Sequence, residues 1–438
     1  MNHSALVYSH SVSPRLQYVV DFLSQYYGLS FKLIYDEEKF INAPDQCKIN
    51  YGYHRLVANE IFIHSHVLLF ETSVRSVKIE CFEQNGYKAF FKTEGDFGFD
   101  LVAAVFFLIT RYEEYLPHRK DIYGRYAHEN SIAFREGFIN LPLINFWLED
   151  FRRLLSEKNS QFSILNSQFK FLPTYDIDMA WSFRNKGFKR NFANISLLFL
   201  KAQFRKAFYR IKVIRGKKQD PFDAYEWMDQ LHQQFQLHPI YFFLVAKETG
   251  KYDKNIDVSN KEFQQLVHSI SAKYQIGLHP SWSSGDVASL LTQEKSTLEQ
   301  IANEQVISSR QHFIRFDLPT TYRRLIALGI TNDYSMGYGS INGFRASVAT
   351  KFYWYDLKKE EKTNLQVHPF CFMEANSFYE QKFSADEALN ELVHYHKISK
   401  EVNGTLITIW HNSFLGRAEE FKGWREMYQQ FISSIAKG

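Results

Sequence analysis

Cysteine is scarce in this chain of 438 residues: Cys47, Cys81 and Cys371 are odd in number and lie far apart. This argues against a disulfide framework and against a cysteine-based zinc site, and it fits a reducing compartment. Long apolar runs are also lacking, because the longest, Leu101 to Ile109, is too short to cross a bilayer. The start of the sequence lacks the pattern of a secretion signal. We therefore expect a cytoplasmic protein.

An excess of one charge sign is absent as well. The net charge is only +4, so the chain as a whole is not a polycation of the nucleic-acid-binding type, and no nucleic-acid partner is expected. Apolar residues make up 45% and charged residues 23%, which excludes a largely disordered chain. The sequence contains no G-x-G-x-x-G, G-x-x-x-x-G-K-[ST], G-x-S-x-G or H-E-x-x-H motif. Nucleotide-binding, serine-hydrolase and zincin functions are therefore unsupported.

The chain divides into two regions of different pattern. Residues 1–165 alternate short apolar runs with polar breaks and contain one strong helical stretch, expected over Phe99 to Tyr115, so they predict a small α/β domain. Residues 166–438 alternate strand-like and amphipathic helical segments, which predicts parallel strands in a barrel or an open sheet. The expected strands there are KFLPTYD, PIYFFLVA, YQIGLH, HFIRF, GITNDYS, LQVHPFCFM and TLITIWH.

A basic segment interrupts the second region. Residues 184–218 contain 12 Lys or Arg and no Asp or Glu, interleaved with aromatic and aliphatic residues. Three interpretations stay open: a solvated helix packed on the domain, a surface that touches anionic lipid or a lipid-linked glycan, and a nucleic-acid-binding surface. The second of these predicts peripheral contact with the inner face of the membrane.

Polar residues follow three of the predicted strands. Asp176 closes KFLPTYD, His279 closes YQIGLH and His411 closes TLITIWH. Since active sites of parallel α/β barrels form at the carboxyl ends of the strands, these residues predict one common site. Asp176 and Asp178 are two apart, so on an extended strand end both point to the same side.

Two neighbouring carboxylates repel each other, which favours protonation of one or binding of a cation. One carboxylate would then hold a metal ion while the other serves as a general base, an arrangement suited to hydrolysis. His312, in RQHFIRF, is a candidate second imidazole ligand. Further candidates for substrate contact or orientation are Arg310, Asp333, Arg345, Trp410, Tyr175 and Ser281.

These residues resemble the motifs of the polysaccharide deacetylase superfamily of carbohydrate esterases. Thr174 to Asp178 (TYDID) is similar to its Thr-aromatic-Asp-Asp motif with one residue inserted, Arg310 lies at the third motif, and His411 follows the last strand. SVSPRLQYV, FDLVAAVFFLITRYEEYLP and DIYGRY in the first half resemble a two-part bacterial group with a preceding domain of unassigned function. The resemblance implies a deformed (β/α)7 barrel, a divalent metal ion, with zinc expected, and a carbohydrate substrate.

The resemblance also implies roles for individual residues. Asp176 would be the base, Asp178 and His279 metal ligands, His411 the general acid, and Asp333 the residue that orients it. The superfamily's second motif normally has two histidines four apart, whereas Ser283 stands four residues after His279. We infer that His312 replaces the missing ligand.

The expected function is thus a metal-dependent hydrolase that removes N-acetyl groups from an amino sugar in a glycan or a glycan precursor. The altered second motif keeps an alternative open, namely a catalytically inactive glycan-binding or scaffold protein in polysaccharide biosynthesis.

Overall fold

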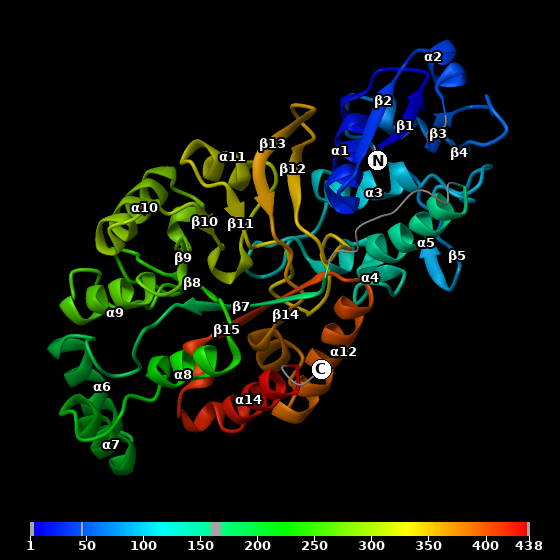
Figure 1. Ribbon diagram of the computed structural model, residues 1–438. Coiled ribbons are helices and arrows are strands. Elements are labelled where there is room, and N and C mark those ends of the chain that lie inside the picture. Colours follow the sequence, from blue (N-terminus) through cyan, green and yellow to red (C-terminus); the bar gives the residue numbers. More distant parts are fainter. Residues whose placement is uncertain (1–3, 45–46, 159–167, 436–438) are drawn as a thin grey trace.

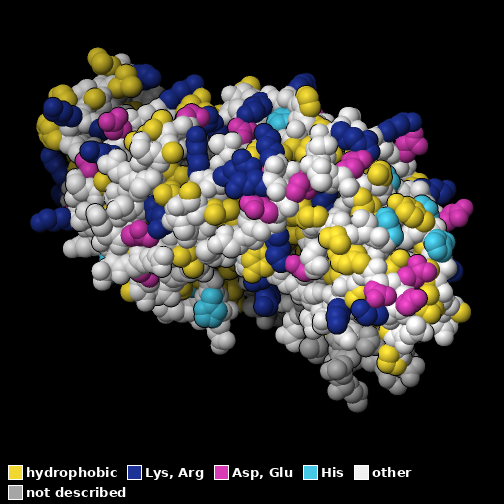
Figure 2. All heavy atoms as spheres, turned by 90° about the horizontal axis from the view of Figure 1, so that it is seen from above, with side chains coloured by type: hydrophobic (Ala, Val, Ile, Leu, Met, Phe, Trp, Pro, Cys, Tyr) yellow, Lys and Arg dark blue, Asp and Glu magenta, His cyan; other side chains and the backbone are white. Residues whose placement is uncertain are grey.

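A computed structural model describes residues 4–44, 47–158 and 168–435 (Figure 1). The expected boundary between the two regions, at residues 165 and 166, lies outside the described residues. Figure 1 shows the N-terminal elements packed at one end of the larger C-terminal part. Charges of both signs are interspersed over the face drawn in Figure 2. Among the helices that the structure describes, none combines the length and the apolar character needed to cross a membrane.

The N-terminal part contains a parallel four-stranded sheet with the strand order β2-β1-β3-β4. Helix α1 starts where the hydroxyl of Ser13 accepts the amide hydrogen of Leu16 and ends at Gly28, whose φ of 63° suits glycine. The strands and helices of this part are β1 (Ser4–Ser9), α1 (Pro14–Tyr27), β2 (Ser30–Ile34), α2 (Glu37–Asn42), β3 (Cys47–Gly52), β4 (Ile61–His64), β5 (Phe82–Gln84), β6 (Tyr87–Ala89), α3 (Leu101–Ile109), α4 (Ile132–Arg135) and α5 (Leu143–Lys158).

The single long helix expected over Phe99 to Tyr115 is divided in the structure. Helix α3 ends at Ile109, and a separate 3-10 turn covers Tyr112–Tyr115. Arg111 between them adopts a left-handed φ of 55°. Its buried guanidinium donates to Glu113 and Glu114, and this local ion-pair network accompanies the break in the helix.

The C-terminal part is mixed α/β and is built on a sheet with the order β12-β13-β11-β10-β9-β8-β7-β15-β14. All neighbouring strands in it are parallel except β12 and β13, which are antiparallel. The strands of this sheet are β7 (Lys170–Ile177), β8 (Ile240–Phe243), β9 (Gln275–Leu278), β10 (Ser308–Ser309), β11 (Asn332–Asp333), β12 (Phe352–Asp356), β13 (Glu361–Val367), β14 (Phe372–Met373) and β15 (Thr405–His411).

The sheet is strongly curved. Strands β13 and β14 lie at opposite ends of the parallel run, yet only residues 368–371 separate them in sequence. Helices surround the strands, which leaves most strand side chains buried (Figure 1). The helices of this part are α6 (Phe188–Leu200), α7 (Phe204–Ile214), α8 (Tyr225–Phe235), α9 (Lys261–Ser271), α10 (Ala288–Ala302), α11 (Thr320–Ala327), α12 (Ala385–Glu401), α13 (Asn412–Leu415) and α14 (Trp424–Ile435).

One predicted strand of this part is wrong. HFIRF does not pair in the sheet: His312–Ile314 forms a 3-10 turn, and the strand at this position is β10, just before it. Phe313 and Ile314 have left-handed φ values of 58° and 55°, which a strand does not accommodate. The turn places His312 beyond the end of β10.

Buried polar contacts join the two parts. Arg15 of α1 pairs with Glu360 in the β12–β13 turn, with Nε to Oε2 at 2.8 Å. Glu114 accepts two hydrogen bonds from Arg345, at 2.8 and 2.7 Å. One continuous hydrophobic cluster contains side chains of both parts, so they form a common core.

Candidate active site

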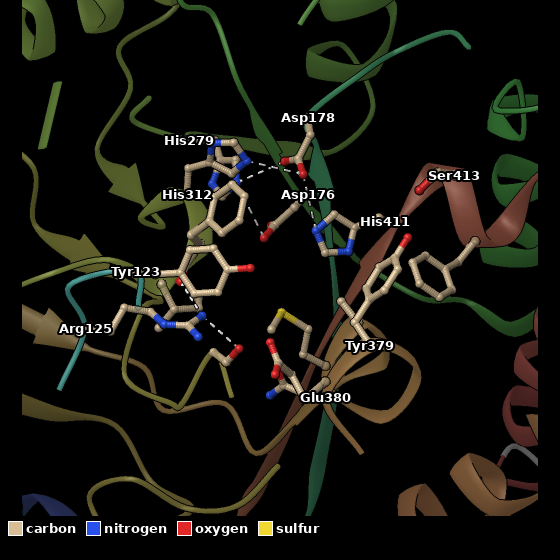
Figure 3. A pocket seen from close by; sticks show the side chains of 17 residues that line it. Tyr123, Arg125, Asp176, Asp178, His279, His312, Tyr379, Glu380, His411 and Ser413 are labelled. Atoms are coloured by element: carbon tan, nitrogen blue, oxygen red, sulfur yellow. Dashed lines mark hydrogen bonds and ion pairs between the residues drawn. The ribbon is translucent and has the colours of Figure 1, made fainter. Parts of the chain in front are cut away.

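The register of two neighbouring strands brings Asp176 and His411 together. Strands β7 and β15 pair in parallel with His411 opposite Asp176 and Trp410 opposite Tyr175. Because side chains alternate along a strand, Asp176 and His411 share one face of the sheet and the two aromatic residues share the other. Asp178 follows β7 directly and lies on the same side as Asp176 (Figure 3).

Three imidazoles face the carboxylate of Asp178 (Figure 3). The Nε2 atom of His279 lies 3.1 Å from Oδ1, and the Nε2 atoms of His312 and His411 lie 3.5 and 3.6 Å from Oδ2. The potential ligand atoms of Asp178, His279 and His312 all lie within 4.8 Å of one another. Oδ1 of Asp178 is buried and accepts no hydrogen bond from the described residues. These atoms have the identity and the spacing of a cation site.

The far nitrogen of each imidazole is held by the protein. The Nδ1 atoms lie 2.6 Å from the carbonyl oxygen of Arg310 for His279, 3.0 Å from Asp253 Oδ1 for His312, and 2.7 Å from Glu374 Oε1 for His411. Contacts of this kind fix the ring orientation and favour the tautomer whose Nε2 lone pair is free to bind a metal. The donor set therefore fits a divalent cation at Asp178, His279 and His312.

The charges around Asp178 are strongly coupled. Burial by itself raises the pKa of its carboxyl, but the facing His312 and His411 outweigh burial and hold that pKa well below its usual value. Burial lowers the pKa of His312, but Asp178 and Asp253 outweigh burial and raise this pKa to about 9. For His411, burial is opposed by Glu374 and Asp178, which raise the pKa to about 10. The site is thus an anionic centre that attracts positive charge, as protons on imidazole or as a cation.

Asp176 is held by Arg310. The Arg310 Nη1 atom donates to Asp176 Oδ1 at 2.8 Å, and both side chains are almost fully buried. The guanidinium also donates to the carbonyl of Tyr334 and packs 4.4 Å from the ring centre of Phe242. Oδ2 of Asp176 lies 3.8 Å from Nε2 of His279. Arg310 therefore fixes the carboxylate beside the cation site.

These groups open into a cavity of about 490 Å³. Two lining residues, Tyr123 and Arg125, come from the N-terminal part, and no motif in the sequence marks them as site residues. Asp121 holds them in place, because its Oδ1 accepts both backbone amides and its Oδ2 accepts from Arg125 Nε at 2.6 Å. Tyr379 and Phe414 form an aromatic wall on the other side, with ring centres 6.0 Å apart.

The role expected for Asp333 needs correction. Its buried carboxylate accepts hydrogen bonds from Tyr322 and Ser335, whereas Glu374 contacts the Nδ1 atom of His411 and accepts its backbone amide. Burial raises the pKa of Asp333 to about 6 despite these hydrogen bonds. Glu374 directly follows β14, so the rule that identified Asp176, His279 and His411 also applies to it.

Four expected substrate contacts are directed away from the cavity. Tyr175 and Trp410 lie on the opposite sheet face and pack against Tyr428 of α14, because they alternate with Asp176 and His411. Ser281 donates to Glu294 at 2.5 Å and thereby fixes the turn after His279. Arg345 pairs with Glu114 and joins the two parts of the chain.

Comparison with known families finds one match, in the N-terminal part. Residues 5–160 match the model of a family of unknown function (DUF7033). No curated protein matches the sequence.

Solved structures with similarity to this chain include proteins described as polysaccharide deacetylases and one described as an allantoinase. A protein described as a polysaccharide deacetylase from Mycobacterium smegmatis is 12% identical, with a TM-score of 0.39, and the match covers 62% of this chain and 85% of that chain. A protein so described from Pseudomonas aeruginosa PAO1 is 9% identical, with a TM-score of 0.40 and coverage of 62% and 86%. The CE4 family pseudoenzyme BA3943 from Bacillus anthracis is 9% identical, with a TM-score of 0.30 and coverage of 62% and 61%.

Proposed function

We propose that this protein is a metal-dependent deacetylase that hydrolyses N-acetyl groups of an amino sugar in a glycan or a glycan precursor. One observation carries the proposal: imidazole Nε2 atoms converge on the half-buried carboxylate of Asp178, and a second carboxylate, Asp176, lies beside them. Hydrolysis of an amide needs an electrophilic centre, a base and an acid in one place. This cluster offers ligands for a cation, a carboxylate that can act as the base and an imidazole that can act as the acid.

Asp178, His279 and His312 would hold the metal ion. Two imidazole nitrogens and one carboxylate oxygen are ligands that zinc accepts, and three protein ligands are typical of a catalytic rather than a structural zinc site. A divalent cation bound there would supply Lewis-acid polarisation of the acetyl carbonyl.

Asp176 and His411 would move the protons. Asp176, oriented by Arg310, would take a proton from the attacking water, and His411 would donate one to the departing nitrogen. Asp176 and His411 lie side by side on adjacent strands, next to the cation ligands, which supports a base and an acid acting on one substrate (Figure 3). Glu374 supports the acid role, because its carboxylate stabilises the protonated form of His411.

The cavity suits a sugar. Its aromatic residues, among them Tyr123, Phe313, Tyr379 and Phe414, offer flat apolar faces of the kind that pack against sugar rings, while Arg125 and Glu380 add polar groups. Tyr123 and Arg125 belong to the N-terminal part. We infer that residues 1–165 form a domain that completes the substrate cavity of the domain formed by residues 166–438.

The strand order is consistent with a deformed (β/α)7 barrel. If β13 and β14 are counted as one bent strand, the parallel run of described strands has seven positions, and its two ends are joined by residues 368–371. In such a barrel the strand ends that carry Asp176, His279 and His411 meet at one opening.

An inactive glycan-binding protein is the alternative. It is favoured by Ser283, which stands four residues after His279, where the motif of the superfamily has a second histidine. Ser283 lies in a 3-10 turn there and cannot replace an imidazole as a ligand. His312 compensates by facing Asp178 from another loop, which supports the active form.

Acetate release separates the two functions. The purified chain is incubated with N-acetylglucosamine oligomers, with added zinc and with a chelator. We expect acetate release that the chelator abolishes and that zinc restores. Glycan binding by the zinc-loaded chain without acetate release would support the alternative.

A further inference from the structure

Helices α6 and α7 form a hairpin that projects from the sheet at the same end as the cavity. The hairpin is inserted between β7 and α8, and α6 starts ten residues after Asp178. Connections that follow a parallel strand lie at its carboxyl end, which is where Asp176 and Asp178 lie. In Figure 1 the two helices lie beyond the arrowhead of β7, at the left-hand edge of the molecule.

The hairpin exposes large hydrophobic side chains. Leu200 is 85% exposed and Phe188 is 82% exposed. Eight of the exposed large hydrophobic residues in the described chain lie in this hairpin: Phe188, Phe192, Leu197, Phe199, Leu200, Phe204, Phe208 and Ile214. Exposed apolar groups in such a cluster mark an interaction surface.

The apolar side chains form stripes along the helices. Phe188 and Phe192 are four apart in α6 and their rings stack with centres 5.9 Å apart. The ring centre of Phe199 lies 5.9 Å from the ring centres of both Phe204 and Phe208, across the tip of the hairpin. A surface helix of a globular protein normally turns its apolar stripe inward, whereas here the stripe faces out.

Polar contacts hold the inner side of the hairpin. Arg210 of α7 is buried and donates from Nη2 to Asn191 of α6 at 2.8 Å. Asp220 accepts the backbone amides of residues 182, 183 and 184 at 2.7, 2.8 and 2.9 Å. The Arg210–Asn191 contact joins α7 to α6 on their inner side, and the Asp220 contacts tie together the chain segments before α6 and after α7.

Positive charge accompanies the apolar stripe. Residues 184–218 carry 12 Lys or Arg and no acidic residue. Lys201, Arg205 and Lys206 are exposed at the tip, next to Leu200 and Phe204. Figure 2 shows hydrophobic and basic side chains side by side at the left-hand end of the molecule, the end at which Figure 1 places α6 and α7.

We propose that the α6–α7 hairpin docks the protein on an anionic lipid bilayer. Exposed aromatic and aliphatic side chains beside clustered Lys and Arg are what a helix needs to lie in the headgroup region, with its apolar side in the acyl boundary. Basic residues add attraction to anionic lipids, and the absence of acidic residues removes the opposing repulsion. Nucleic acid would use the charges but leave the apolar stripe in water. Docking would place the cavity opening close to the bilayer.

Vesicle flotation with the full chain tests the docking. We expect binding to vesicles of equal parts phosphatidylcholine and phosphatidylglycerol, weaker binding in high salt, and little binding to phosphatidylcholine alone. The variant Lys201→Ala/Arg205→Ala/Lys206→Ala should bind about 100-fold more weakly, because each of the three basic residues near an anionic surface contributes about fivefold. Leu200→Ser/Phe204→Ser should lose about tenfold or more at every salt concentration.

A matched control removes three exposed lysines elsewhere, as Lys32→Ala/Lys397→Ala/Lys422→Ala. It should bind as the unchanged protein does, and all variants should keep the same melting temperature because the altered side chains are exposed. No binding to the anionic vesicles at low salt, or equal binding by the hairpin and control variants, overturns the proposal. Self-association that Leu200→Ser/Phe204→Ser abolishes, without vesicle binding, would instead assign the stripe to a second copy. None of these measurements depends on hydrolase activity.

Discussion

Asp178 is the residue on which the site converges. Imidazole nitrogens approach it from the loops after β9 and β10 and from the last residue of β15, and a carbonyl or carboxylate oxygen contacts the other nitrogen of each ring. Such outer contacts cost binding affinity or activity when they are removed, because they keep the ligands in the productive orientation. We therefore expect different effects when the base, Asp176, is replaced and when Glu374, which contacts the acid His411, is replaced.

Replacement of Asp176 by Asn tests the base. We expect Asp176→Asn to lower kcat about 1,000-fold or more, because an amide cannot accept the proton. Metal content should stay near that of the unchanged protein, since Asp178, His279 and His312 remain. Acetate release and elemental analysis of the same sample measure both. Turnover at the original rate would remove Asp176 from the mechanism.

Replacement of Glu374 by Gln tests the positioning of His411. Glu374 raises the pKa of His411, so its loss should lower that pKa and move the alkaline limb of the pH–rate profile to lower pH. We expect kcat to fall about 10- to 100-fold with little change in KM. Glu374→Asp should restore part of the rate. An unchanged alkaline limb together with a lower melting temperature would reduce Glu374 to a structural role.

At the scale of elements, strands with strong apolar runs could be predicted from the sequence. KFLPTYD, PIYFFLVA, YQIGLH and TLITIWH coincide with β7, β8, β9 and β15, because a fully buried strand needs continuous apolar residues. HFIRF has the same composition, yet the left-handed φ of Phe313 turns it out of the sheet. Strands β3 and β12 were not predicted. A backbone angle and a pairing between distant segments are set by tertiary contacts, which no local pattern reports.

The same reasoning explains which site residues the sequence could identify. Asp176, His279 and His411 follow recognisable strands, so their positions at one edge could be predicted. Tyr123 and Arg125 lie in a loop of the other part of the chain, and only the packing of the two parts brings them to the cavity. Their turn, with Gly124 at a φ of 74°, has no local feature that points to a ligand.

Gly339 of the C-terminal part packs against the Arg125 side chain, so a substitution there tests the role of this loop. A Cβ on Gly339 would overlap Arg125 Nη1 and would lie 2.9 Å from the carbonyl oxygen of Phe313, so Gly339→Ala must displace the arginine. We expect KM for the glycan to rise about 10-fold, as for loss of one polar contact to a ligand, with a smaller change in kcat. Gly250→Ala, where a Cβ meets nothing within 4 Å, is the matched control. Equal KM values for both variants would exclude the loop from substrate binding.

At the scale of the whole molecule, buried ion pairs link the two parts. Glu114 of the N-terminal part lies between Arg111 and Arg345, and all three side chains are almost fully buried. Removal of one partner of such a group leaves an unpaired buried charge. The resulting loss of folding stability is larger than the stability that an exposed ion pair contributes. We therefore expect the stability that this contact between the two parts contributes to depend on pH.

The pH dependence has a definite sign. Burial raises the pKa of Glu114, but Arg345 and Arg111 outweigh it and lower the pKa to about 2, from 4.5. The unfolded chain binds this proton more readily, so the stabilisation is complete above about pH 4.5 and is lost as the pH falls towards 2. The shift corresponds to about 3 kcal/mol.

Urea unfolding at several acidic pH values measures this contribution. Glu114→Gln should lower the free energy of unfolding at neutral pH by about 3 kcal/mol and should flatten its decline in acid. Lys120→Ala, which breaks an exposed pair with Asp317 between the same two parts, should change it by less than about 1 kcal/mol. A Glu114→Gln variant with an unchanged acid decline would contradict the linkage.

The most direct measurement is anomalous diffraction from crystals of the full chain grown with zinc. We expect one zinc ion bonded to Asp178 and to the Nε2 atoms of His279 and His312, with Asp176 and His411 nearby but not bonded to it. Ordered side chains at these positions without an ion between them, or an ion held only at other residues, would contradict it.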